Sequence, residues 1–357
     1  ALTSPLLDMR PFLPPPPETP ADGEEPETTA PAKAGKRDKN ARLIPSTPID
    51  LSPFAAFDAD VSVEADRIVG HTRRLKDLQV LARVTQGSLI VDEASGTDES
   101  RGKITFSGFA VPGENGHRVG LDVDGFDINI GFPARNPDEV ELLPRFNLMG
   151  EVYSTGSNLR ELAAGLNGAL QVTAGEGRVS SQASGLLTNA FLDELFDLVN
   201  PLRQQEDYTQ VRCLTLLAEV KDGKLKGDPL ATLVTSKFAV ISKAQVDLSS
   251  EKLFLTFNTI PQRGLGISAS TAFKPFVGVA GTLARPQLTL DPEGTIIQGS
   301  LAVMTGGISL IGKSVLDRFT VSKKSCRKAE DSFIDEHEVA EAAYLKFREQ
   351  VLAGVAN

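Results

Sequence analysis

The chain has 357 residues, of which 41% are hydrophobic, and it carries a formal net charge of −10. An acidic surface repels phosphate backbones, so this charge argues against a nucleic-acid partner, and the one basic cluster, at residues 323–328, has no interleaved aromatic residues. The only two cysteines, Cys213 and Cys326, are too few for a zinc cluster or a disulfide-dense scaffold. Composition leaves open whether they are two buried thiols or one bridge.

Residues 1–45 are expected to form a disordered linker. Within them, Leu13 to Asn40 holds four consecutive prolines, then an acidic stretch and then a basic one, with almost no large apolar side chains. Such a segment cannot bury enough surface to offset the entropy of ordering. The first ten residues also lack the charged and apolar regions of a signal peptide. We therefore expect either that a leader has been removed or that the chain is the C-terminal part of a longer protein.

Beyond the linker, apolar and polar residues alternate with a period of two, which is typical of strands that have one apolar and one solvated face. At Gly125 the apolar set changes phase by one residue, which predicts a β-bulge. The dipeptides Gln86-Gly87 and Asp222-Gly223 predict tight hairpin turns. The strands are expected near residues 57–65, 78–84, 89–91, 104–106, 119–130 with this bulge, 170–174, 179, 238–248 and 253–257, and on either side of Asp222-Gly223.

Helices are expected to be few. Asn158 and Glu161 form a capping pair for a short helix, and a second short helix is expected from Leu187 to Val199. The fold class is therefore mainly β: an elongated, curved antiparallel β-meander, or groove-like sheet, over residues 46–292 with these two short helices. Residues 293–357 are expected to form an apolar end segment and a C-terminal helix at about 334–352.

One motif near the C-terminus points elsewhere. Gly307, Gly312, Lys313 and Ser314 match the G-x-x-x-x-G-K-[ST] pattern of phosphate-binding P-loops. The residues between the two glycines are bulky and apolar, and an antiparallel meander precedes the motif where a nucleotide-binding fold needs a parallel sheet. We therefore expect no nucleotide, and interpret this segment as an apolar end piece with Lys313 as an interfacial cation.

No catalytic or metal-binding residues are expected, and no cofactor. The histidines, His71, His117 and His337, lie far apart among polar neighbours, so each is expected to be solvated at the surface. There is no G-x-S-x-G elbow for a serine nucleophile.

Four stretches in order resemble the C-terminal region of the AsmA family of bacterial envelope proteins: PIDLSPFAAFDADVSVEADRI, NLRELAAGLNGALQVTAGEGRV, NPLRQQEDYTQVRCLTLLAEVKDGKL and VGVAGTLARPQLTLDPEG. The most specific elements are G-T-L-x-x-P, from Gly281 to Pro286, and the pair Asp291-Pro292. The resemblance implies a curved antiparallel sheet with an apolar concave face, in a non-enzymatic protein of outer-membrane biogenesis or phospholipid transport between membranes.

The expected partner is a phospholipid or another acyl lipid, with a membrane surface and envelope proteins as further partners. A continuous apolar face can shelter acyl chains, since each buried CH₂ contributes about 0.8 kcal/mol. Two alternatives stay open: the same residues pack the core of a sandwich, or the protein is a scaffold for outer-membrane protein assembly that binds no lipid. The candidate lipid-facing residues are Val61, Val63, Val80, Val119, Leu121, Val123, Phe126, Ile128, Val240, Val246, Leu253, Leu255 and Phe257.

The resemblance also implies a location in the periplasm, with a tether to the inner membrane through an N-terminal helix that this sequence does not include. In that compartment a bridge between Cys213 and Cys326 is expected, because disulfides persist in oxidising surroundings. The bridge would tie the C-terminal tail to a central strand.

Overall fold

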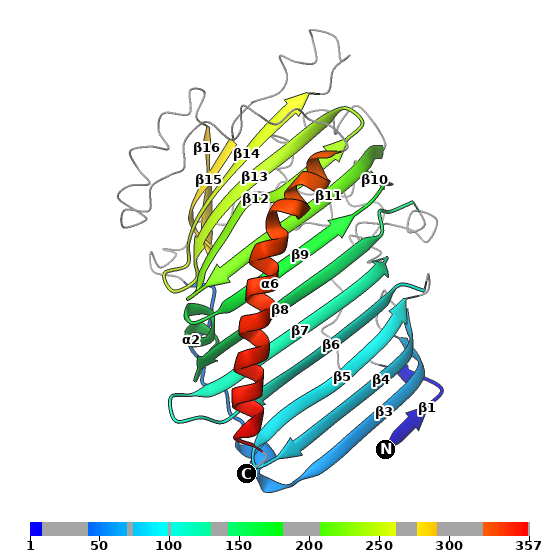
Figure 1. Ribbon diagram of the computed structural model, residues 1–357, viewed down its shortest axis with the longest axis vertical. Coiled ribbons are helices and arrows are strands. Elements are labelled where there is room, and N and C mark those ends of the chain that lie inside the picture. Colours follow the sequence, from blue (N-terminus) through cyan, green and yellow to red (C-terminus); the bar gives the residue numbers. More distant parts are fainter. Residues whose placement is uncertain are drawn as a thin grey trace, which may run out of the picture.

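The computed structural model describes residues 1–8, 42–69, 74–98, 101–129, 142–180, 208–261, 277–290 and 324–355. These residues form a mainly β architecture, a 16-stranded sheet that is open, elongated and curved (Figure 1). The predicted fold class is confirmed. The predicted helix at 187–199, the P-loop-like motif, Asp291-Pro292 and His71 lie outside the described residues.

The elements follow one another as a meander. Strands β3 to β9 are antiparallel neighbours in chain order, β9 pairs with β11, and β11 to β16 continue the order, while β10 adds to the end of β11. The strands are β1 (Leu2–Ser4), β2 (Leu7–Asp8), β3 (Ala59–Val69), β4 (Arg74–Thr85), β5 (Ser88–Asp98), β6 (Lys103–Val111), β7 (His117–Ile128), β8 (Phe146–Gly156), β9 (Asn167–Ala174), β10 (Gly177–Ser180), β11 (Tyr208–Lys221), β12 (Lys224–Thr235), β13 (Phe238–Asp247), β14 (Lys252–Pro261), β15 (Val277–Thr282) and β16 (Arg285–Leu290). The helices in the described residues are η2 (Ser52–Ala56), α2 (Leu159–Ala164) and α6 (Lys324–Ala353).

Both predicted hairpin turns are present. Asp222 and Gly223 have φ of 48° and 69° and join β11 to β12. Gln86 and Gly87, with φ of 48° and 76°, join β4 to β5 in the same way. Two successive residues of positive φ give a turn whose twist matches that of the flanking strands, which is why these dipeptides set the register of the meander.

The N-terminus departs from the expectation of a linker over residues 1–45. Strands β1 and β2 pair with β3, and both run parallel to it, so the sheet is mixed at this edge. The apolar residues Leu2 and Leu7 can therefore extend the sheet although the segment is too short to show a period. Strands β8, β15 and β16 were also not predicted.

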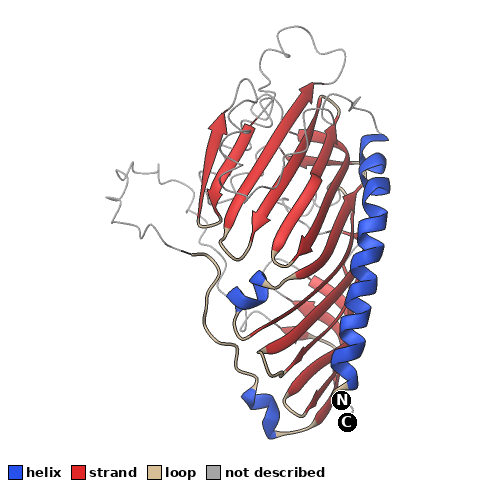
Figure 2. Cartoon of the chain, turned by 60° about the vertical axis from the view of Figure 1, so that its left-hand side comes forward, coloured by secondary structure: helices blue, strands red, loops and turns tan. Residues whose placement is uncertain are grey.

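Helix α2 is capped as expected, and helix α6 is longer than expected. In α2 the side chain of Asn158 accepts the N–H of Glu161 at 3.0 Å, and the Glu161 carboxylate accepts the N–H of Ser157 at 2.7 Å, so the predicted capping pair is confirmed. Helix α6 begins at Lys324, ten residues before the predicted start at 334. It lies across the strands on one face of the sheet, whereas α2 and η2 lie toward the other side (Figures 1 and 2).

Candidate functional site: the apolar face of the sheet

The two faces of the sheet are defined by helix α6. On the face that we call the helix face, Phe109 of β6 packs against Tyr344 and Phe347 of α6, with ring centroids 6.5 and 6.1 Å apart. Successive side chains of a strand point to opposite faces, so Phe106 and Gly108 belong to the other face. We call this second surface the apolar face.

The strand register aligns uncharged residues in rows across the apolar face. One row runs through Val63, Val80, Ala94, Phe106, Val123, Gly150, Leu170 and Ala218. A second, which we call the long row, runs from β5 to β15 through Gly96, Ile104, Gly125, Leu148, Val172, Leu216, Ala231, Ser242, Phe257 and Val277.

Neither row contains a charged side chain. Since neighbouring strands lie about 4.8 Å apart, the long row extends roughly 40 Å. This uncharged strip is longer than the hydrocarbon thickness of a bilayer, about 30 Å.

The register brings the predicted lipid-facing residues together on the apolar face, with one exception. Phe126 pairs with Lys103, which alternates in phase with Phe109 and not with Phe106, so Phe126 belongs to the helix-face side. The predicted bulge is present, because the register shifts between Gly125 and Ile128, and Asp127 has φ of 55°. The extra residue follows Gly125, however, so Gly125 and Ile128 stay on the apolar face and Phe126 does not.

Exposure divides the apolar face into two parts. At β3, β6 and β7, Val61, Phe106 and Leu121 are 40%, 40% and 43% exposed, although they are large and apolar. At β13 and β15, Ala244 and Val277 are 3% and 1% exposed. The accessible part of the apolar face, marked by Val61, Phe106 and Leu121, therefore lies within strands β3 to β7.

Helix α6 covers the helix face with a single buried stripe. Cys326, Ala329, Phe333, Tyr344 and Val351 are all buried against the sheet, and their intervals of 3, 4, 11 and 7 residues keep them on one helix face.

A disulfide fixes the first turn of α6 to the sheet. Cys326 bridges to Cys213 of β11, with the two Cα atoms 6.4 Å apart, so the predicted bridge is confirmed. The bridge and the stripe together hold α6 on the helix face, which leaves the apolar face clear of this helix.

A buried contact between a histidine and a carboxyl group interrupts this stripe. His337 Nε2 lies 3.5 Å from Glu151 Oε1 of β8, with side chains 10% and 8% exposed, so the prediction of a solvated histidine is wrong for His337. Burial raises the pKa of the Glu151 carboxyl from its ordinary 4.5 to about 7, and the acids Asp122, Glu341 and Asp124 act in the same direction. A carboxyl in these surroundings favours its neutral form.

One row of strand ends carries a strap, which we define as residues 42–56. The carboxylate of Glu251, between β13 and β14, accepts the N–H groups of Leu43 and Ile44 at 2.6 and 3.1 Å. Farther along, the Ile49 carbonyl oxygen lies 2.8 Å from His117 Nε2, so His117 is a half-buried contact of the strap and not a solvated residue. The strap thus joins strand ends that are far apart in the sheet, and we call this row of ends the strap rim.

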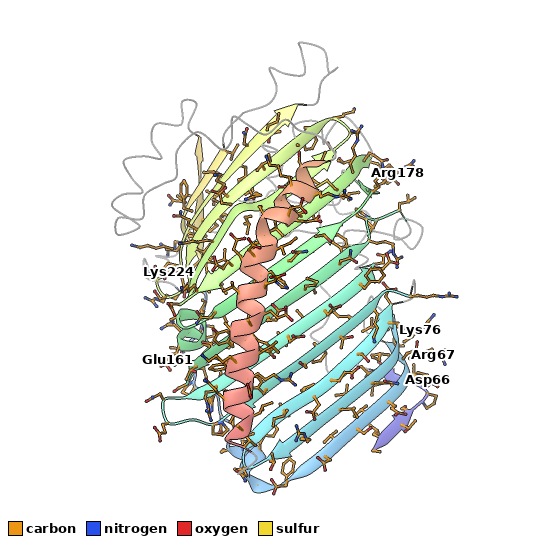
Figure 3. All side chains as sticks on the ribbon, viewed as in Figure 1. Asp66, Arg67, Lys76, Glu161, Arg178 and Lys224 are labelled. Carbon is orange, nitrogen blue, oxygen red and sulfur yellow. A yellow bond between two sulfur atoms is a disulfide. The ribbon has the colours of Figure 1, made fainter. Side chains whose placement is uncertain are left out.

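Helix α2 lies at the strap rim on the apolar-face side. Ser154 lies two residues after Val152 and therefore on the apolar face. Its hydroxyl donates a hydrogen bond to the Leu162 carbonyl at 2.6 Å. The opposite row of strand ends, which we call the far rim, carries Arg67, Lys76 and Arg178 (Figure 3).

Several of these features gave a weak sequence signal. Leu148, Gly150 and Val152 of β8 lie on the same face of the strand. The two-residue period of this strand is visible in the sequence only if glycine is counted as an apolar-face residue. The pairing of Glu151 with His337 depends on how α6 packs on β8, and no local pattern indicates it. Within the described part of the chain, no group of histidine, cysteine and acidic residues could hold a metal ion.

Comparisons with known proteins add no relative. No model of a known protein family, no curated protein and no solved structure matches this chain. Among the residues described here, no helix is both long enough and apolar enough to cross a membrane.

Proposed function

We propose that this chain is a non-enzymatic envelope protein of AsmA type that accommodates the acyl chains of phospholipids, or of related lipids, on its apolar face. The observation that carries the proposal is the long row, which crosses the sheet from β5 to β15 without a charged side chain. In the proposed role the sheet serves outer-membrane biogenesis or the transport of phospholipid between membranes.

The exposed apolar residues on β3 to β7 support this proposal. An isolated exposed leucine is ordinary, but several large apolar side chains exposed on one face of a sheet indicate a place where something apolar binds. Apolar contacts have no preferred direction, and each CH₂ removed from water contributes about 0.8 kcal/mol. Such a surface holds an acyl chain without fixing its position along the row, which suits transport better than selective capture.

The disulfide between Cys213 and Cys326 supports a periplasmic location. Disulfides persist in oxidising compartments and are rare where thiols are kept reduced. Of the compartments in which an acyl-binding envelope protein could work, the periplasm combines that chemistry with access to both membranes.

A lipid-binding assay with paired variants tests the proposal. Phe106→Asp and Leu121→Asp each place a charge on the accessible part of the apolar face, and Val339→Asp is the matched control, because Val339 is 71% exposed on α6. We expect the purified protein to carry phospholipid and to bind a fluorescent acyl lipid. The first two variants should bind that lipid at least tenfold more weakly, and the control should bind as the unmodified chain does.

The same experiments separate the proposal from a scaffold that assists outer-membrane protein assembly. A chain that carries no lipid, takes up no labelled acyl chain and crosslinks only to envelope proteins would favour the scaffold. Equal weakening by all three variants would contradict a binding surface on the apolar face.

A further inference from the structure

A row of basic side chains runs along the far rim. The register aligns Arg67 of β3, Lys76 of β4, Thr97 of β5, Lys103 of β6 and Phe126 of β7 as successive cross-strand partners. We call these residues the basic row. Figure 3 shows Arg67 and Lys76 at this rim, whereas Lys224 and Glu161 lie at the strap rim.

The charges of the basic row are not neutralised by partners. Within the described ranges, Arg67, Lys76 and Lys103 take part in no ion pair, and all three are exposed. Arg67 and Lys76 are direct cross-strand partners, an arrangement in which like charges destabilise a sheet. Among the described residues, the row therefore holds its positive charge without an ion pair.

Acidic side chains also lie near the row, but none stands within it. Asp66 and Asp77 flank the row, with the Asp77 carboxylate accepting the hydroxyl of Thr97 at 3.0 Å, and the buried Asp98 follows Thr97 in β5. Arg101, exposed in the turn before β6, adds a further cation. By contrast, the comparable row at the strap rim, Lys221–Lys224–Asp247–Lys252, has a carboxylate between its lysines.

The basic row ends on an exposed aromatic side chain and borders the apolar face. Phe126 is 69% exposed, among the highest values of the large apolar residues. Ile104 and Gly125, the strand neighbours of Lys103 and Phe126, belong to the long row. The strands that carry the basic row, β3 to β7, are also those on which the apolar face is accessible, so cations, an exposed aromatic ring and an apolar surface meet at one rim.

We infer that the far rim at β3 to β7 docks on a bilayer surface that contains anionic phospholipid. Arg67, Lys76 and Lys103 contact the headgroups, and Phe126 enters the interfacial region. Acyl chains then pass over this rim onto the adjoining apolar face. This last step rests on the proposed function, whereas the docking itself does not.

The charge of the whole protein makes this docking directional. At −10 the chain as a whole is repelled by an anionic surface, but screening at about 0.1 M salt limits each charge to roughly 10 Å. A local row of cations can therefore bind while the rest of the surface stays away. Each Lys or Arg at such a surface contributes about 1 kcal/mol, or about fivefold in affinity, so the three cations together supply about 100-fold.

Vesicle binding by two charge-matched variants tests the inference. Arg67→Gln, Lys76→Gln and Lys103→Gln are combined in one variant, and Lys221→Gln, Lys224→Gln and Lys252→Gln in the control, so both lose the same net charge. Sedimentation is measured with phosphatidylcholine vesicles with and without phosphatidylglycerol. The basic-row variant should bind the anionic vesicles about 100-fold more weakly, and the control should lose less than fivefold.

Two further readouts complete the test. Phe126→Ser should weaken vesicle binding with the charge unchanged, and binding of the intact chain should fall steeply as salt is added. The inference is overturned if the two triple variants lose affinity equally, or if the chain binds neutral and anionic vesicles alike. A fluorescent acyl lipid supplied without vesicles should bind the basic-row variant normally; its failure to bind even the unmodified chain would reject the proposed function and leave the docking result unaffected.

Discussion

Replacing Glu151 by glutamine should make the protein more stable at neutral and alkaline pH. The pKa of this carboxyl is raised by burial from 4.5 to about 7. Below about pH 4.5 the Glu151 carboxyl is protonated in both the folded and the unfolded chain. Its contribution to the free energy of unfolding therefore does not change with pH in that range. Between 4.5 and 7 the unfolded chain releases the proton and the folded chain retains it, so stability falls as the pH rises.

The size of this effect follows from the same two values. At about 1.4 kcal/mol for each pKa unit, the difference corresponds to about 3 kcal/mol of stability lost by pH 8 relative to pH 4. Glutamine cannot ionise, so Glu151→Gln should unfold at nearly the same urea concentration as the unmodified chain at pH 4. At pH 8 it should be more stable, by up to about 3 kcal/mol.

Urea unfolding curves across this pH range provide the assay, with Glu161→Gln as the control. Hydrogen bonds from Ser157 and Asn158 lower the pKa of the Glu161 carboxyl, so its stabilisation is present above pH 4.5 and is lost as the pH falls. The control should therefore be less stable than the unmodified chain at pH 8, the opposite sign. Lower stability of Glu151→Gln at pH 8 would contradict this expectation, because it would mean that the ionised Glu151 carboxylate stabilises the fold.

Three further changes test other contacts. Cys213→Ser opens a bridge with a sequence separation of 113 and should cost about 4–5 kcal/mol, and reducing agent should lower the urea midpoint of the unmodified chain but not of the variant. Glu251→Ala leaves two strap N–H groups without their acceptor and should cost about 1–3 kcal/mol, with proteolytic cleavage of the strap appearing before the sheet unfolds. Gly223→Val forces a side chain onto φ of 69° and against the Ala164 carbonyl, so it should cost at least 1–3 kcal/mol, whereas Gly175→Val, with no atom within 4 Å, should change thermal stability little.

Local chemistry accounts for what could be predicted from the sequence. The alternation in β3, β4, β13 and β14 follows from the two-residue period of a strand, and Asp222-Gly223 specifies its turn through positive φ. The cap of α2 is likewise local, since Asn158 and Glu161 bond across three residues. These features need no knowledge of the distant chain.

Long-range packing accounts for what could not be predicted. The parallel pairing of β1 with β3 joins segments about 60 residues apart, and nothing in Leu2 to Ser4 indicates it. Phe126 was assigned to the wrong face because the bulge residue follows Gly125 and does not coincide with it. The burial of His337 depends on the docking of α6, so its polar neighbours in the sequence were misleading.

Site-specific photocrosslinking in cells shows whether phospholipid occupies the apolar face. A photoreactive residue is placed at Leu121 on the accessible apolar face and, as the control, at Leu345, which is 48% exposed on α6. We expect adducts with phospholipid at position 121 and none at position 345, detected by mass spectrometry of the crosslinked protein. Phospholipid absent from position 121, or captured equally at both positions, would contradict a lipid-binding apolar face.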